Sequence, residues 1–247
     1  MGIALHRDLI EKNYRLWSHK PLLHRCYIEF HQRMAGYLSK LSDKKMVELG
    51  AGMGNIHETI PDCIRTDLFP YSWIDQVENA YNLTFEDASL SDLLMTDVFH
   101  HLRYPGTALM EFQRVLKPGG RLIMMEPCIS ALGYIVFGLF HPEPIGKAKQ
   151  IQWFTPKGWS PDNIDYYSSQ GNATSIFVQN YFTSELSGWK IIEVKQISAL
   201  AYAASGGYSG PQLYPTFAFP FIKFLEKLMQ PFPALFATRL LIVLENK

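Results

Sequence analysis

The chain has 247 residues, with 23 basic and 23 acidic side chains and therefore no formal net charge at neutral pH. This length suits one large α/β domain with a substantial core, and the balanced charge argues against a nucleic-acid partner, which would need a basic surface. Three scattered cysteines indicate reduced thiols in a cytoplasmic chain. The apolar run 129–140 is too short to cross a bilayer, so no transmembrane segment is expected.

The first 44 residues are expected to form helices. Apolar side chains recur every three or four positions over residues 8–17 and 21–41. Pro21 suits the first turn of the second helix, because proline lacks an N–H that this position does not need.

A strand over residues 46–49 ends in a turn with three glycines, Gly50, Gly52 and Gly54. Glycine lets a backbone approach a ligand closely, because no Cβ stands in the way. Glu48 places a carboxylate at the carboxyl end of this strand, where ligands bind in open α/β sheets. The helix that follows can only cover residues 55–60, because Pro61 stops it.

The next two strands are expected at residues 63–66, before Asp67, and at residues 73–77. The stretch between them is shorter than the dozen residues of an ordinary parallel crossover. The third strand is therefore expected to be short and peripheral, or the crossover to be an extended loop.

The alternation of strand and helix then continues, which is typical of the α/β class. A strand is expected over residues 91–98, an amphipathic helix over residues 107–116, a turn at the sequence KPGG, and a strand over residues 121–126.

The second half of the chain is less regular. Residues 128–187 are too long for a plain connection and are expected to form an insertion and cap near the active face. Two strands, residues 189–197 and 239–245, flank an apolar helix over residues 217–229. We therefore expect one domain, made of N-terminal helices (1–44), a cofactor-binding core (45–127), the cap (128–187) and C-terminal strands with an apolar insertion (188–247).

Four sequence motifs in the core resemble class I S-adenosylmethionine-dependent methyltransferases. They are VELGAGMGN, the acid Asp67 that closes the second strand, NLTFEDASLSDLLMTDVFHHL and EFQRVLKPGGRLIMMEP. They are most similar to the small-molecule group with HHL and RVLKPGG motifs, over about residues 45–127. The resemblance implies a Rossmann-like sheet with helices on both faces and an antiparallel last strand. Here the connections around strands 2 and 3 are shortened, and insertions build a cap.

The same resemblance implies S-adenosyl-L-methionine as the cofactor. Glu48 would receive its ammonium group, and Asp67 would accept hydrogen bonds from both ribose hydroxyls, since a carboxylate offers two acceptor oxygens. The glycine loop would contact the tail and ribose through Gly50, Ala51, Gly52 and Gly54.

The resemblance also names residues for the two ends of the cofactor. Leu68 would pack against adenine. Asn79 and Ala80 stand where the family has Asp before Ala, so an amide oxygen would take the place of a carboxylate toward the adenine amino group. Thr96 and Asp97 would lie near the methionine portion.

The sequence leaves two alternatives to methyl transfer. A nicotinamide-dependent oxidoreductase is disfavoured, because the loop reads G-x-G-x-G rather than G-x-G-x-x-G. A non-catalytic binding protein of the methyltransferase fold is disfavoured by the intact glycines and Asp67.

Four side chains are candidates for the catalytic base that a hydroxyl or amine acceptor would require. They are Asp97, His100, Glu126 and His141, and each also has a structural explanation, such as capping or pairing. A metal site is not expected, because the adjacent His100 and His101 at a helix start should point in different directions.

The acceptor is expected to be a small apolar or aromatic molecule, including a lipid-linked one, because aromatic side chains are frequent in the variable segments. Residues 217–236 are rich in Leu, Ile and Phe. A cap helix buried on the domain is the favoured interpretation, and peripheral membrane contact is the alternative.

Overall fold

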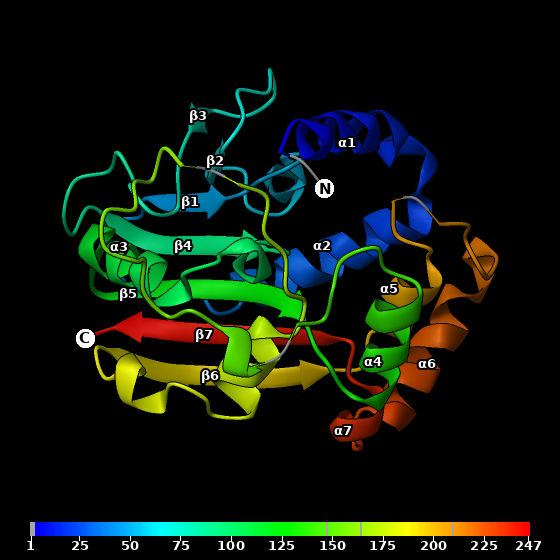
Figure 1. Cartoon of the computed structure of the whole chain (residues 1–247). Coiled ribbons are helices and arrows are strands. Elements are labelled where there is room, and N and C mark those ends of the chain that lie inside the picture. Colours follow the sequence, from blue (N-terminus) through cyan, green and yellow to red (C-terminus); the bar gives the residue numbers. More distant parts are fainter. Residues whose placement is uncertain (1–2, 147, 164, 209) are drawn as a thin grey trace.

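The protein is built on one mixed β-sheet (Figure 1). The computed structural model describes residues 3–146, 148–163, 165–208 and 210–247, and within them seven strands pair in the order β3-β2-β1-β4-β5-β7-β6. The strands are β1 (Met46–Leu49), β2 (Ile64–Asp67), β3 (Gln76–Val77), β4 (Leu90–Thr96), β5 (Leu116–Pro127), β6 (Trp189–Ile197) and β7 (Arg239–Asn246). Strands β1 to β5 are parallel, and β7 is antiparallel to both of its neighbours. The predicted Rossmann-like sheet with an antiparallel last strand is confirmed.

Helices cover both faces of this sheet, as predicted. They are α1 (Ile3–Leu16), α2 (Pro21–Ala35), α3 (Pro105–Val115), α4 (Ala131–Leu139), α5 (Leu200–Ala204), α6 (Phe219–Met229) and α7 (Pro233–Phe236). One core cluster joins the sheet to α3, and the other joins it to α2, α5 and α6. In Figure 1, all helices except α3 gather at the end toward which the arrows of β4 and β5 point.

The connections around β2 and β3 are short, as the sequence predicts. The helix expected over residues 55–60 is instead a single 3-10 turn, Asn55–Glu58, because Gly54 enters it at φ +67° and Pro61 follows. The loop after β2 is filled by Trp73, whose indole N–H donates to the Gly52 carbonyl oxygen at 2.8 Å. Its ring stacks on Tyr71, and Tyr14 of α1 also stacks on it at 3.8 Å. Strand β3 is two residues long and lies at the sheet edge.

Two other expectations needed correction. Helix α2 ends at Ala35 rather than at residue 41, because the chain turns at Gly36 so that Ser39 can bond the buried Asp92 carboxylate through its N–H and hydroxyl. Strand β5 begins before the KPGG turn. The register of β5 against β4 shifts there, with Gly119 at φ +76°, so the turn is a bulge inside the strand.

Of the helices formed by the described residues, none is both long enough and apolar enough to cross a membrane.

Candidate active site

A cavity of about 370 Å³ opens at the carboxyl ends of the parallel strands. This is the position at which open α/β sheets bind ligands. Its wall includes residues from the N-terminal helices, the core, the cap and the C-terminal segment, for example Asn13, Gly50, His141 and Arg239. The predicted cofactor residues on the wall are Glu48, Gly50, Ala51, Gly52, Asp67, Leu68, Asn79, Ala80, Thr96 and Asp97.

The glycine loop is shaped by close packing beneath it. Gly50 has φ +65°, and a Cβ there would lie 2.6 Å from Cγ2 of Val98. A larger residue is therefore disfavoured both by the backbone conformation and by the steric clash. The Gly52 N–H donates to Oδ2 of Asp67 at 2.9 Å, which ties the loop to the end of β2. Gly54, predicted to contact the cofactor, is not part of the cavity wall. A Cβ there would meet Arg65 and Trp73, so its role is to form the turn.

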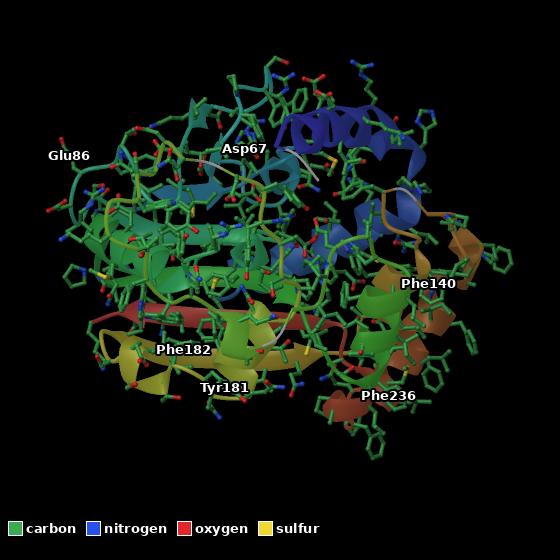
Figure 2. The ribbon with its side chains drawn as sticks, in the orientation of Figure 1. Asp67, Glu86, Phe140, Tyr181, Phe182 and Phe236 are labelled. Carbon is green, nitrogen blue, oxygen red and sulfur yellow. The ribbon has the colours of Figure 1, made fainter. Side chains whose placement is uncertain are left out.

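Two buried carboxylates stand beside this loop. Burial raises the pKa of Glu48 well above its ordinary value, and the negative charge of the nearby Asp67 adds to this shift. Within the described part of the chain, Oε2 of Glu48 is buried without a hydrogen-bond partner. Burial also raises the pKa of Asp67, although the N–H groups of Gly52 and Phe69 donate to it. In Figure 2, Asp67 lies at the end of β2, on the side of the molecule where α1 sits. Oε2 of Glu48 lacks a donor, and each Asp67 oxygen has a second lone pair available, so the site fits a ligand with an ammonium group and hydroxyls.

The adenine end predicted by the sequence is covered by the insertion. The Asn79 side chain donates to the Pro161 carbonyl oxygen at 2.9 Å, while its amide oxygen accepts the Tyr81 N–H. Trp159 packs edge-on against Tyr81 at 5.1 Å. An amide oxygen has two lone pairs, so Asn79 retains one for a ligand donor.

A buried ion pair forms the floor of the cavity. Arg239, the first residue of β7, is fully buried and donates two hydrogen bonds to Asp97, at 2.6 and 2.7 Å. Burial would raise the pKa of Asp97, but the charge and hydrogen bonds of Arg239 lower it below its ordinary value. Tyr27 also donates to Asp97, at 3.2 Å. Asp97 is therefore a weak base that is already engaged. The sequence reasoning missed Arg239, although a lone charge opening the apolar run RLLIVLE was a signal that a buried partner exists.

Glu126 lies behind the cavity wall rather than on it. It is fully buried, and one carboxylate oxygen accepts the N–H groups of Val98 and Phe99, both at 2.8 Å. The other oxygen is 2.8 Å from Nδ1 of His100. Burial would lower the pKa of His100, but Glu126 and then Glu143 outweigh it and raise that pKa to about 10. Glu126 thus fixes the β4 exit loop and orients His100.

The adjacent histidines do not diverge as the sequence argument expected. The rings of His100 and His101 lie 4.2 Å apart, because both belong to a tight 3-10 turn, Phe99–His101. Nε2 of His100 is 3.5 Å from Glu143, and Nε2 of His101 is 3.9 Å from it. His141, also on the cavity wall, has Nδ1 3.9 Å from the same carboxylate, and burial lowers its pKa.

The part of the cavity beyond the histidines is aromatic. Aromatic residues of the variable segments line the cavity, among them Phe137, Tyr166, Tyr167, Tyr202 and Tyr208. Others have different surroundings. Tyr134, Phe140 and Phe154 are exposed, and Trp153 is buried against Phe182, on which it stacks at 4.6 Å. Tyr214 donates to the Ala201 carbonyl oxygen and lies outside the wall.

Comparisons with known proteins agree with this architecture. Residues 47–124 match the family model described as a methyltransferase domain. An S-adenosylmethionine-dependent methyltransferase from Thermotoga maritima, described as a possible histamine N-methyltransferase, is similar at a TM-score of 0.51 and 17% identity, over 94% of this chain and 95% of that one. Geranyl diphosphate C-methyltransferase from Streptomyces coelicolor A3(2) was solved with Mg²⁺, geranyl diphosphate and S-adenosyl-L-homocysteine. It is similar at a TM-score of 0.50 and 13% identity, over 90% of this chain and 77% of that one. No curated protein matches the sequence.

The sheet order and the similar solved structure define a Rossmann-like fold with the cavity at its carboxyl edge. Residues 47–124 match a methyltransferase domain, and the chain as a whole has the fold of S-adenosylmethionine-dependent methyltransferases. The partnerless Glu48 oxygen and the Asp67 carboxylate fit the ammonium group and ribose of S-adenosylmethionine.

Proposed function

We propose that the protein transfers the methyl group of S-adenosylmethionine to a small apolar or aromatic acceptor. One observation carries the proposal: a single cavity joins the glycine loop and its two acids to a wall of aromatic side chains. Apolar walls with a few fixed polar groups are typical of sites for such molecules. Because the wall draws on all four parts of the chain, we also propose that they work as one domain.

The bound cofactor supplies a methyl group on a sulfonium, which a nucleophile of the acceptor attacks in line as the sulfur–carbon bond breaks. The protein contributes alignment. Glu48 and Asp67 would hold the cofactor, and the Arg239–Asp97 pair fixes the cavity wall at the end of β4. Such orientation of reactants can supply about 7–11 kcal/mol. The aromatic wall keeps water away from the reacting atoms.

The four catalytic candidates separate into two roles. Asp97 and Glu126 act as positioning residues, because their carboxylates are already occupied by Arg239 and by His100 with backbone N–H groups. His100 and His141 also line the cavity, where an acceptor can contact them.

Calorimetric titration with S-adenosylmethionine and S-adenosylhomocysteine tests the cofactor assignment. We expect both to bind, and Asp67→Ala to weaken binding about 10- to 100-fold, since a hydrogen bond to a charged group contributes about 1.5–3 kcal/mol. Asp62→Ala is the matched control, because Asp62 is exposed and outside the cavity wall. Failure of the wild type to bind either molecule would overturn the proposal. Binding without methyl transfer to any apolar aromatic acceptor would favour the non-catalytic alternative.

An apolar face on the helical end of the molecule supports a lipid-linked acceptor. Helix α6 was expected to be buried, but its outer side is exposed. The exposed side chains of this face are Tyr134, Ile135, Leu139 and Phe140 around α4, Phe217, Phe221, Phe224 and Leu228 around α6, and Phe232 and Leu235 around α7. Figure 2 shows Phe140 and Phe236 at this end, far from Glu86. Contiguous exposed apolar surface of this kind marks an interaction site.

Helix α4 connects the apolar face to the cavity. Its Phe137 lines the cavity, whereas Tyr134 and Leu139 of the same helix are exposed. On α6, the acid Glu226 is buried against Lys223, while Lys227 is exposed, so the outer side presents a cation among apolar groups. We therefore propose peripheral contact with a membrane surface from which an apolar acceptor enters along α4.

Flotation with vesicles that contain anionic phospholipid tests this contact. We expect the wild type to float and Phe224→Asp to remain in the dense fraction, because a charge would have to enter the apolar layer. Met110→Asp is the matched control, since Met110 is equally exposed but lies on α3. A wild type that stays in the dense fraction removes the membrane proposal and leaves methyl transfer untouched.

A further inference from the structure

We infer that His100, His101 and Glu143 form a binding site for a divalent transition-metal ion such as Zn²⁺ on the acceptor side of the cavity. The two imidazole nitrogens and a carboxylate oxygen all lie within 4.8 Å of one another. All three residues line the cavity, so an ion held by them would face the space assigned to the acceptor. The inference goes beyond methyl transfer and does not depend on it.

The distances suit such an ion. In a tetrahedral site with bonds of about 2.1 Å, neighbouring ligand atoms are about 3.4 Å apart. Nε2 of His100 is 3.5 Å from Oε2 of Glu143, and Nε2 of His101 is 3.9 Å from Oε1. The three ligand atoms lie within 4.8 Å of one another, so side-chain movements of up to about 1.4 Å bring them to tetrahedral separations. Two histidines and one carboxylate leave a coordination position open toward the cavity, which is the pattern of reactive rather than structural sites.

The surroundings of the histidines provide the strongest argument. Metal-binding histidines almost always donate their second ring N–H to a carboxylate or a backbone carbonyl. Here Nδ1 of His100 contacts the Glu126 carboxylate at 2.8 Å, and Nδ1 of His101 contacts the Tyr167 carbonyl oxygen at 2.9 Å. Both contacts place the proton on Nδ1 and turn Nε2 toward Glu143.

The third ligand is held in place in the same way. The carboxylate of Glu143 accepts hydrogen bonds from Tyr166, from Ser168 at 2.7 Å, and from Gln170. Ligating carboxylates are commonly fixed by such donors. Within the cluster, Glu126 and Glu143 contribute two negative charges, which raise the pKa of His100 in the metal-free protein. A divalent cation balances the same two charges when it takes the place of the Nε2 proton.

Equilibrium dialysis of chelator-treated protein against Zn²⁺, with metal analysis of the protein fraction, tests the site. We expect one ion per chain in the wild type. His101→Ala and Glu143→Gln should each weaken binding by about 100-fold or more, since loss of a supporting contact alone costs about 10- to 100-fold. His24→Ala is the matched control, because His24 also pairs with a glutamate, Glu58, but at a half-exposed position away from the cavity. Circular dichroism verifies that each variant is folded.

A second measurement needs no variant. In wild-type protein labelled with ¹⁵N-histidine, Zn²⁺ should shift the Nε2 signals of two histidines and leave their Nδ1 signals protonated. Co²⁺ should give the visible absorption of a low-coordinate nitrogen and oxygen site. Absence of binding with Zn²⁺ in excess, unchanged binding in both ligand variants, or binding without any shift of histidine signals would each overturn the inference.

Discussion

His31 makes the stability of the protein depend on pH in a predictable direction. It is fully buried on α2, and neither ring nitrogen has a hydrogen-bond partner among the described residues. Burial lowers its pKa from 6.5 to about 4. Well above pH 6.5, His31 is unprotonated in both the folded and the unfolded chain. As the pH falls below 6.5, the unfolded chain takes up a proton that the folded chain refuses until about pH 4, so the free energy of unfolding decreases.

The size of this effect follows from the two pKa values. Between about pH 7.5 and about pH 5, the linkage contributes a loss of about 2 kcal/mol in the free energy of unfolding. His31→Leu removes the titrating group. Between the two pH values, the free energy of unfolding of this variant should therefore fall by about 2 kcal/mol less than that of the wild type. The variant should also be more stable at about pH 7.5 by about 1–3 kcal/mol, because two unsatisfied polar atoms leave the core.

Urea denaturation followed by circular dichroism at the two pH values measures both quantities. The matched control is His19→Leu, which removes an exposed histidine and should keep the wild-type loss between the two pH values. The reasoning is refuted if His31→Leu shows the same pH-dependent loss as the wild type, since the folded chain would then bind the proton as readily as the unfolded one.

Two further substitutions test the cavity. Gly50→Ala should weaken cofactor binding more than 10-fold in the calorimetric titration, because its Cβ would lie 2.6 Å from Val98 and push the loop outward. Gly119→Ala is the control. Gly119 also has a positive φ, but its Cβ would lie 3.9 Å from the nearest atom, so this variant should bind the cofactor normally. Arg239→Met should lower the free energy of unfolding by about 3–5 kcal/mol in urea, because it strands the Asp97 charge. Adding Asp97→Asn should recover part of the lost stability. If the double variant is destabilised as much as Arg239→Met alone, the pairing of Arg239 with Asp97 is contradicted.

The part of the site closest to the sheet could be predicted from sequence because it depends on local patterns. Strand β1 was expected at residues 46–49 and β6 at residues 189–197, and both are observed there. A parallel sheet brings the carboxyl ends of its strands to one edge, so Glu48 and Asp67 had to lie near each other. The short reach from β2 to β3 followed from chain length alone.

The acceptor side could not be predicted, because it is assembled by contacts between distant segments. Glu143 lies in an insertion without periodicity, and nothing in its neighbourhood in the sequence indicates that it meets His100. The position of Glu126 depends on which side of β5 faces the β4 exit loop. Arg239 pairs with Asp97 across the sheet, which no local pattern encodes.

The indole of Trp73 has a consequence for spectroscopy. Its ring is stacked on Tyr14 and Tyr71, and its N–H is bonded to the Gly52 carbonyl oxygen in the glycine loop. A movement of that loop therefore changes both the polarity and the stacking of one chromophore. The protein therefore carries an optical reporter of movement in the glycine loop. Trp73→Phe should remove that part of the fluorescence change and leave the part that comes from Trp159 on the cavity wall.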